Sequence, residues 1–265
     1  MSPNQTKVSA ALATLRDPHT GLGLVEQGSV RGSGVDGGRV AVELQLAYPA
    51  RGWHEALAAE ARACLEALPG VEQATVSVSS RVHAHKVQKD LTPMPEVRNI
   101  IAVASGKGGV GKSTTAVNLA LALQAEGARV GVLDADIYGP SIPKMLGLSG
   151  RPDSPDGKTI EPKRNHGLQA MSIGLLVGED TPMIWRGPMV TQALQQLLND
   201  TRWDDLDYLV IDLPPGTGDI QLTLAQRVPV SGAVIVTTPQ DIATLDARKA
   251  LQMFAKVEVP VLGIV

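Results

Sequence analysis

The chain has little cysteine, few aromatic residues and little net charge, and each shortage excludes a class of protein. Cys64 is the single cysteine among 265 residues, so no disulfide can form within the chain. Aromatic residues make up 3% of the sequence and hydrophobic residues 43%, so the core must be mostly aliphatic. The net charge of −3 offers no general attraction to nucleic acid or to an anionic membrane. A reducing compartment agrees with this composition.

Targeting signals are lacking as well. The N-terminal residues contain no apolar stretch of the kind found in secretory signals. No apolar run approaches the roughly 20 residues that cross a bilayer. We therefore expect a soluble, cytoplasmic protein without nucleic-acid or membrane partners. Cys64 falls on the apolar face of an expected helix, which favours a buried structural thiol, and His83 and His85 are too few for a metal site.

The first 82 residues are expected to form a small α+β domain. Alternating apolar residues predict a strand at 39–46, and an apolar stripe ended by Pro69-Gly70 predicts a helix at 53–68. A further helix at 10–16 and a further strand at 71–79 complete this domain. The polar segment 83–98, which holds two prolines, is predicted to be a linker.

Residues 99–265 alternate between apolar runs and helical patterns. Strands are predicted at 99–104, 130–133, 208–211, 233–237 and 259–265, with helices at 190–198, 220–227 and 242–256. This alternation predicts an α/β domain, a mostly parallel sheet with helices on both faces. Residues 261–265 are predicted to be a buried strand. Because the sequence stops there, we expect the domain to be incomplete at its C-terminal end.

A glycine-rich segment, the glycine loop, lies between the first of these strands and a helical pattern. Its residues match G-x-x-x-x-G-K-[ST] and are Gly106, Lys107, Gly108, Gly109, Val110, Gly111, Lys112, Ser113 and Thr114. Glycines allow successive backbone N–H groups to turn around a phosphate. Lys112 supplies a positive charge to the β- and γ-phosphates of a nucleotide, and the Ser113 hydroxyl is suited to Mg²⁺. The segment therefore predicts a nucleotide site.

Aspartates follow two of the predicted strands. Asp134 and Asp136 come after one strand and Asp212 ends another, and ligand sites in such sheets lie at the carboxyl ends of strands. Ser113, Asp134 and Asp212 are the predicted Mg²⁺ ligands, and Asp136 is a candidate for orienting an attacking water. Residues 213–219 combine prolines and glycines, which suits a loop that senses the γ-phosphate; the alternative is an ordinary tight turn.

Lys107 places a second cation in the glycine loop. Such a cation is suited to offset negative charge in a phosphoryl-transfer transition state, and it could reach a nucleotide in a facing subunit. The alternative is a solvated surface lysine. The predicted catalytic set is therefore Lys107, Lys112, Asp136 and Asp212.

These motifs resemble those of the deviant Walker A ATPases, the group with MinD, ParA and the nitrogenase iron protein. Residues 134–141, 185–189 and 212–219 look like the Mrp/ApbC branch, the iron–sulfur cluster carrier ATPases. Residues 15–21 and 68–71 are similar to PaaD-like iron–sulfur assembly domains. The resemblance implies an ATP-binding homodimer that passes a [4Fe–4S] cluster to apo-proteins with the help of assembly factors. It also implies that Lys107 reaches the partner's nucleotide.

The resemblance is incomplete at one point. The family's cluster ligands are a C-x-x-C pair after the strand that matches residues 261–265, and its base-reading asparagine lies just beyond. Two copies of this chain offer only two thiolates, both from Cys64, so we expect the printed chain to hold no stable cluster. Two other functions stay open, a MinD/ParA-like positioning or switch ATPase and a non-catalytic nucleotide-gated scaffold.

Overall fold

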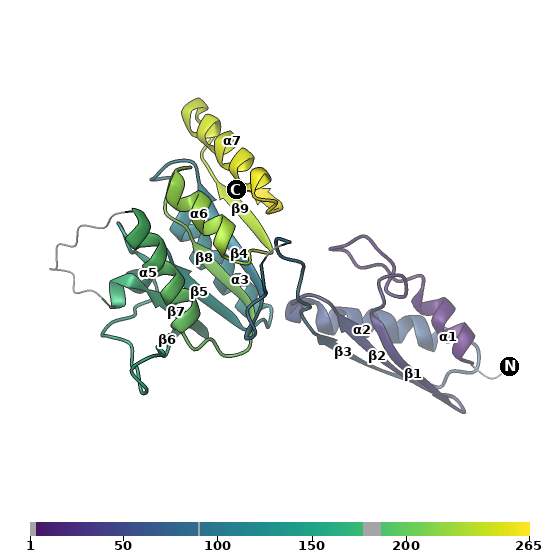
Figure 1. The fold of residues 1–265 in the computed structure, drawn as a ribbon. Helices are drawn as coiled ribbons and strands as arrows, with labels where there is room; N and C mark the ends of the chain where they lie inside the picture. Colours follow the sequence, from purple (N-terminus) through teal and green to yellow (C-terminus); the bar gives the residue numbers. More distant parts are fainter. Residues whose placement is uncertain (1–3, 90, 177–186) are drawn as a thin grey trace. The chain divides into compact units, whose positions relative to one another are not determined.

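A computed structural model describes residues 4–89, 91–176 and 187–265 of the chain (Figure 1). The chain divides into two compact units, Met1–His83 and Ala84–Val265. The predicted linker at 83–98 stays a prediction, although the first strand of the second unit takes its last two residues. None of the helices in the described parts combines the length and the apolar character needed to cross a membrane.

The first unit packs two helices on a three-stranded sheet. Its elements are α1 (Gln5–Leu12), β1 (Val30–Asp36), β2 (Arg39–Leu46), α2 (Arg51–Glu66) and β3 (Gln73–Ser80). The strand order is β1-β2-β3; β1 is antiparallel to β2, and β3 is parallel to it. Every second residue of β2 is buried, from Val40 to Leu46, and these residues form a core with Leu57 and Leu65 of α2. This alternation confirms the strand predicted at 39–46.

Two elements of the first unit differ from the prediction. The helix expected at 10–16 is α1, which starts earlier because the Asn4 side chain accepts a hydrogen bond from the Lys7 N–H at 2.9 Å and caps the helix. Strand β1 was not predicted, since its sequence VRGSGVD has no alternation of apolar residues. It is a strand because it pairs with β2 across a tight turn in which Gly37 has a φ of +58°.

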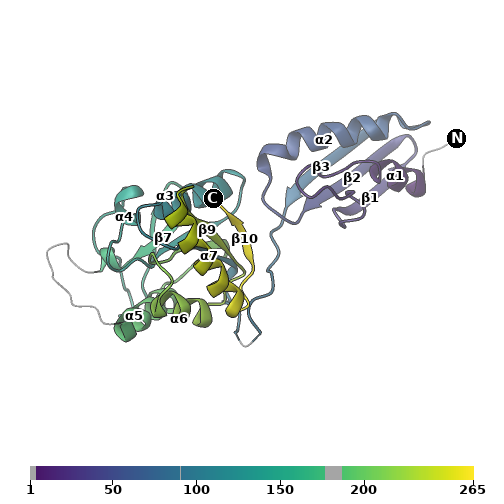
Figure 2. The same cartoon turned by 90° about the horizontal axis from the view of Figure 1, so that it is seen from above.

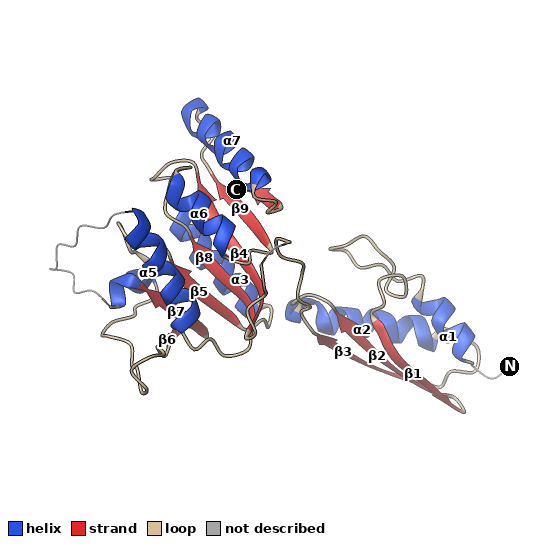
Figure 3. Ribbon diagram, viewed as in Figure 1, coloured by secondary structure: helices blue, strands red, loops and turns tan. Residues whose placement is uncertain are grey.

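The second unit is built on a seven-stranded sheet in the order β10-β9-β4-β8-β5-β7-β6 (Figure 3). The strands are β4 (Val97–Ser105), β5 (Val130–Asp134), β6 (Lys163–Asn165), β7 (Leu168–Ser172), β8 (Leu206–Asp212), β9 (Gly232–Val236) and β10 (Val261–Ile264). All pairings are parallel except that of β6 with β7. The helices are α3 (Lys112–Ala125), α4 (Ile142–Met145), α5 (Gly187–Asp200), α6 (Asp219–Arg227) and α7 (Asp241–Lys256). The predicted α/β class is confirmed.

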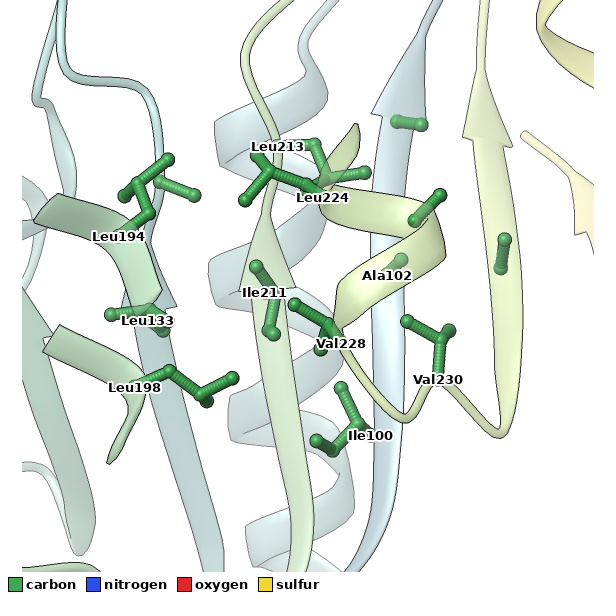
Figure 4. Packing of buried hydrophobic residues seen from close by; sticks show 14 of the residues in the cluster. Ile100, Ala102, Leu133, Leu194, Leu198, Ile211, Leu213, Leu224, Val228 and Val230 are labelled. Atoms are coloured by element: carbon green, nitrogen blue, oxygen red, sulfur yellow. The ribbon is translucent and has the colours of Figure 1, made fainter. Parts of the chain in front are cut away.

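Helices cover both faces of this sheet (Figure 2). In β8, Leu209 and Ile211 belong to the core beneath α5, α6 and α7, whereas Val210 belongs to the core beneath α3 and α4. Figure 4 shows the first of these cores, where Leu194 of α5 and Leu224 of α6 lie over the strands. Strands that are buried on both faces read as continuous apolar runs, which is why β4 and β8 were recognisable in the sequence.

The connections place a topological switch point between β4 and β8. Strand β4 leads through α3 to β5, which lies on the far side of β8. Strand β8 leads through α6 to β9, which lies on the far side of β4. Because α3 and α6 lie on opposite faces, the chain diverges above the carboxyl ends of these two neighbouring strands. Open α/β sheets bind ligands at such a point. The glycine loop follows β4 and Asp212 ends β8, so both lie there.

Several elements of the second unit differ from the prediction. Strands β6 and β7 and helix α4 were not predicted, because they are short and lack a long apolar run. The strand at 261–265 was predicted to be buried, and this was wrong. Strand β10 lies at the edge of the sheet, where Leu262 is 60% and Ile264 57% exposed.

Candidate functional site

The glycine loop joins the end of β4 to the start of α3 and presents open backbone. Gly109 and Gly111 have φ values of +79° and +89°, which favour glycine, and a side chain built at either position would meet no atom within 4 Å. Helix α3 begins after Gly111 without a side-chain cap. Its first N–H groups are therefore available to an anion, and the helix dipole adds a partial positive charge. This geometry fits a phosphate group.

Gly106 is required for a different reason. A Cβ atom at this position would lie 2.3 Å from the backbone carbonyl carbon of Asp246 in α7. No side chain fits there unless α7 moves away. The first glycine of the loop therefore allows a helix to pack closely against it, in addition to any role toward phosphate.

Lys112 brings three of the predicted site residues together. Its side chain is almost fully buried, and its ammonium group donates a 2.6 Å hydrogen bond to Oδ1 of Asp212. Oδ2 of Asp136 lies 3.8 Å and Oγ of Ser113 3.4 Å from the same nitrogen. Asp212 is 100 residues away in the sequence, so this grouping depends on the pairing of β4 with β8.

Asp212 has one oxygen atom without a partner. The residue is fully buried, and Oδ2 has no hydrogen-bond donor among the described residues. A buried carboxylate oxygen without a partner is costly unless water or a cation completes the site. Mg²⁺ prefers oxygen ligands, and the Ser113 hydroxyl contacts the same lysine. The residues present therefore fit a magnesium ion.

Asp134, the third predicted Mg²⁺ ligand, has both oxygens engaged by protein donors. Oδ1 accepts a 3.1 Å hydrogen bond from the Asp136 N–H. Oδ2 accepts from the backbone N–H groups of Ser141 and Ile142 and from the hydroxyl of Ser172, at 3.0–3.1 Å. Asp134 thus holds the segment that carries Asp136 in place, and its role toward a metal stays a prediction.

Asp134 should make the stability of the protein depend on pH. Burial, together with the nearby Asp212 charge, raises the pKa of its carboxyl from 3.8 to about 7. Between these two pH values the folded chain holds a proton that the unfolded chain has lost. The contribution of Asp134 to the stability of the fold is therefore fully present only below about pH 4. We expect that contribution to be lost as the pH rises from about 4 to 7, at about 1.4 kcal/mol per pH unit.

The measurement is urea denaturation of the wild type and of Asp134→Asn between pH 4.5 and 7.5. The wild type should lose stability more steeply with rising pH than the variant. Asp204→Asn, at a side chain that is 70% exposed, is a matched control and should keep the wild-type slope. Equal slopes in the wild type and Asp134→Asn would contradict the raised pKa.

Asp136 and Lys107 are the most accessible of the predicted catalytic residues. The Asp136 side chain is 14% exposed, and burial raises its pKa, against the effect of Lys112 and with that of Asp212. Lys107 is half-buried, and no carboxylate of the described residues lies within 4.0 Å of its ammonium group. Residues 185–189, which resemble the Mrp/ApbC branch, lie partly outside the described residues, which resume at 187.

Three buried polar residues at this end of the sheet were missed in the sequence. Ser172 bonds Asp134, Ser105 donates a 2.9 Å hydrogen bond to the Lys107 carbonyl, and Gln221 bonds the loop after Asp212. Ser105 and Ser172 end strands β4 and β7, and their places at strand ends were the available signal. Gln221 in the first turn of α6 had no comparable signal.

Two family models match the chain. The model described as NUBPL iron-transfer P-loop NTPase matches residues 96–265, and the model described as iron–sulfur cluster assembly protein matches residues 5–78. The two matches correspond to the two compact units. They confirm the resemblance predicted from the motifs.

Individual proteins give the same result. An iron–sulfur cluster carrier protein of Salmonella typhimurium is 59% identical over 225 residues, which cover 84% of this chain and 61% of that protein. One from Synechocystis is 48% identical over 262 residues, covering 97% and 74%. A nucleotide-binding protein of Archaeoglobus fulgidus, solved in complex with ADP, is 41% identical with a TM-score of 0.56 and covers 64% of this chain and 66% of that one. The chain spans about three fifths of the length of several curated relatives.

Proposed function

Because the chain belongs to the NUBPL iron-transfer P-loop NTPase family, we propose that it is part of an ATP-hydrolysing carrier that delivers [4Fe–4S] clusters to apo-proteins. The observation that carries the nucleotide half of this proposal is the buried group of Lys112 and Asp212 beside the open glycine loop. The cluster half rests on the family models, which match both units, and on the names of the relatives.

The nucleotide would bind with its phosphates at the start of α3. The backbone N–H groups at 108–114 would surround the β- and γ-phosphates, and Lys112 would turn from Asp212 toward them. Ser113 and Asp212 would hold Mg²⁺, and Asp134 lies beside Asp212 at the end of the neighbouring strand β5. When bound, the metal neutralises phosphate charge in the transition state. Lys112 would thus pair with Asp212 in the absence of nucleotide and with the phosphates when nucleotide is bound.

Hydrolysis would use Asp136 and Lys107, the more accessible of the predicted catalytic residues. Asp136 lies 3.8 Å from Lys112 and is suited to orient a water for attack on the γ-phosphate. Lys107, with no carboxylate partner among the described residues, would act on the nucleotide of a second copy in a homodimer. Positioning and charge stabilisation supply most of the catalysis of phosphoryl transfer, and two lysines and an aspartate meet that need.

The cluster is the cargo of this reaction, and apo iron–sulfur proteins and assembly factors are its partners. We infer a cytoplasmic protein that acts without nucleic acid or membrane, as the small net charge indicates. A single cysteine per copy supplies two thiolates to a dimer, whereas a [4Fe–4S] cluster usually takes four. Ligands for the cargo are therefore not expected among the residues of the printed sequence.

The test is anaerobic reconstitution of the complete gene product with iron and sulfide, followed by incubation with an apo-acceptor with and without ATP. We expect about four iron and four sulfide per dimer and ATP-dependent transfer. The 265-residue chain is the matched control and should bind ATP but no cluster. ATP binding by the complete product without any cluster would contradict the carrier function and favour a positioning ATPase or a scaffold.

A further inference from the structure

Gln221 is a buried polar residue with no part in the proposed chemistry. It lies in the first turn of α6, and only 7% of the residue is exposed. Its side-chain amide donates a 2.6 Å hydrogen bond to the carbonyl oxygen of Pro215 and a 3.4 Å hydrogen bond to that of Pro214. Both acceptors belong to residues 213–218, the proline loop, which connects Asp212 to α6.

The proline loop has an unusual need for an external donor. Pro214 and Pro215 have no N–H group, so this part of the backbone offers hydrogen-bond acceptors only. Buried carbonyl groups require partners, and the amide of Gln221 reaches two consecutive carbonyls. Gly216 continues the loop with a φ of +103°, a conformation that favours glycine.

The other side of the proline loop is bonded to the strand that leads to the glycine loop. The N–H of Gly216 donates to the carbonyl of Ser105 at 2.9 Å, and the N–H of Leu213 donates to that of Val103 at 3.0 Å. The hydroxyl of Ser105 in turn donates to the carbonyl of Lys107 at 2.9 Å. Hydrogen bonds therefore join Gln221 to the peptide between Pro215 and Gly216, that peptide to Ser105, and Ser105 to the glycine loop.

We propose that Gln221 is a positioning residue that holds the proline loop against β4 and so sets the rate of nucleotide hydrolysis without contributing to nucleotide affinity. The proposal rests on the hydrolytic function proposed above. Among the described residues, the Gln221 side chain hydrogen-bonds to Pro214 and Pro215 and not to Lys112 or the glycine loop, so it acts through Pro215 and Gly216. If the loop moves during turnover, it must either break these bonds or carry the start of α6 with it.

The first test measures the loop itself, in the nucleotide-free protein. Gln221→Met keeps the length and burial of the side chain and removes the amide donor. We expect amide hydrogen exchange in the peptide that spans 212–218 to become about tenfold faster, because both hydrogen bonds from the Gln221 amide to the loop are lost. Exchange in β4 and β8 should stay at the wild-type rate. Unchanged exchange in the proline loop would overturn the proposal, whether or not the protein hydrolyses ATP.

The second test separates turnover from binding. Gln221→Met should lower kcat for ATP about tenfold and leave KM and the ADP dissociation constant within about twofold. A parallel loss of affinity and rate would show that Gln221 supports the whole site and would overturn the positioning role. If wild-type protein shows no hydrolysis, the proposed function fails, while the exchange measurement still decides the role of Gln221.

Gln169 offers a matched control. It is 6% exposed in β7. Its side-chain amide donates a 3.0 Å hydrogen bond to the carbonyl oxygen of Asp204 and accepts another 3.0 Å hydrogen bond from the Asp204 N–H. Gln169→Met therefore removes an equally buried glutamine amide, and it should leave kcat and exchange of the proline loop unchanged. If Gln221→Met does not fold, Gln221→Asn replaces it, since that amide is too short to reach Pro215 and the same changes are expected.

Discussion

Replacement of Lys112 by methionine is expected to abolish nucleotide binding and to destabilise the fold at the same time. The ammonium group is the charge that would contact the phosphates, and losing such charge-assisted bonds should weaken ATP binding roughly a hundredfold or more. The same group is the cation beside the fully buried Asp212 carboxylate, 2.6 Å away. Removing one member of a buried ion pair costs about 3–5 kcal/mol. Calorimetric titration with ATP and urea denaturation measure the two effects.

A double variant distinguishes the two roles of Lys112. Lys112→Met with Asp212→Asn removes both charges of the pair and should regain much of the lost stability without regaining nucleotide affinity. Lys249→Met is a matched control, because Lys249 forms an exposed 3.0 Å pair with Asp246 and such pairs contribute about 0–1 kcal/mol. Normal ATP binding by Lys112→Met would contradict the assigned role, and unchanged stability would contradict the buried pair.

Replacement of Lys107 by alanine is expected to suppress hydrolysis and to leave nucleotide binding largely intact. Lys107 is half-buried at the start of the glycine loop, and its ammonium group has no carboxylate partner among the described residues. A cation of this kind stabilises the transition state more than bound ATP, so kcat should fall about 100-fold or more. Steady-state hydrolysis and ATP titration measure the change. Turnover at the wild-type rate would contradict the catalytic role.

Mixed dimers test whether Lys107 acts on the partner's nucleotide. Lys107→Ala and Asp136→Asn are each expected to be inactive alone. If Lys107 acts across the dimer, an equimolar mixture forms dimers in which one of the two sites is intact, and about a quarter of wild-type activity should return. If Lys107 acts within its own chain, every site of the mixture keeps one defect and no activity returns. Lys107→Arg, which keeps the charge, is the control for the single substitution.

The structural setting of the glycine loop was predictable from the sequence because its signal is contiguous. Residues 106–114 follow an apolar strand and precede a helical pattern, so both the phosphate loop and its setting were recognisable. Asp134 was predicted to be a metal ligand from its place at a strand end, and that role stays a prediction. The four protein donors that surround its carboxylate were not recognisable in the sequence. Those donors include Ser172, which belongs to a strand that no sequence pattern indicated.

Elements were missed where a neighbour, and not the local sequence, makes them a strand. Strand β1 is rich in glycine and forms because β2 lies beside it. Strand β7 is short, and it is fully buried because it pairs with β5 under helices on both faces. Pairing energy of this kind comes from residues that are distant in the chain, so a local pattern cannot report it.

The sequence by itself determined the fold class, the nucleotide motif and the family, because these depend on residue types at fixed local spacing. The tertiary structure alone decided which groups meet. It placed Asp212 beside Lys112 across 100 residues, left one oxygen of Asp212 without a partner in the described chain, and enclosed Asp134 among backbone donors. It also set Asp246 against Gly106 and Gln221 against the proline loop. Such contacts depend on strand order and on helix packing across the sheet, which one-dimensional spacing does not specify.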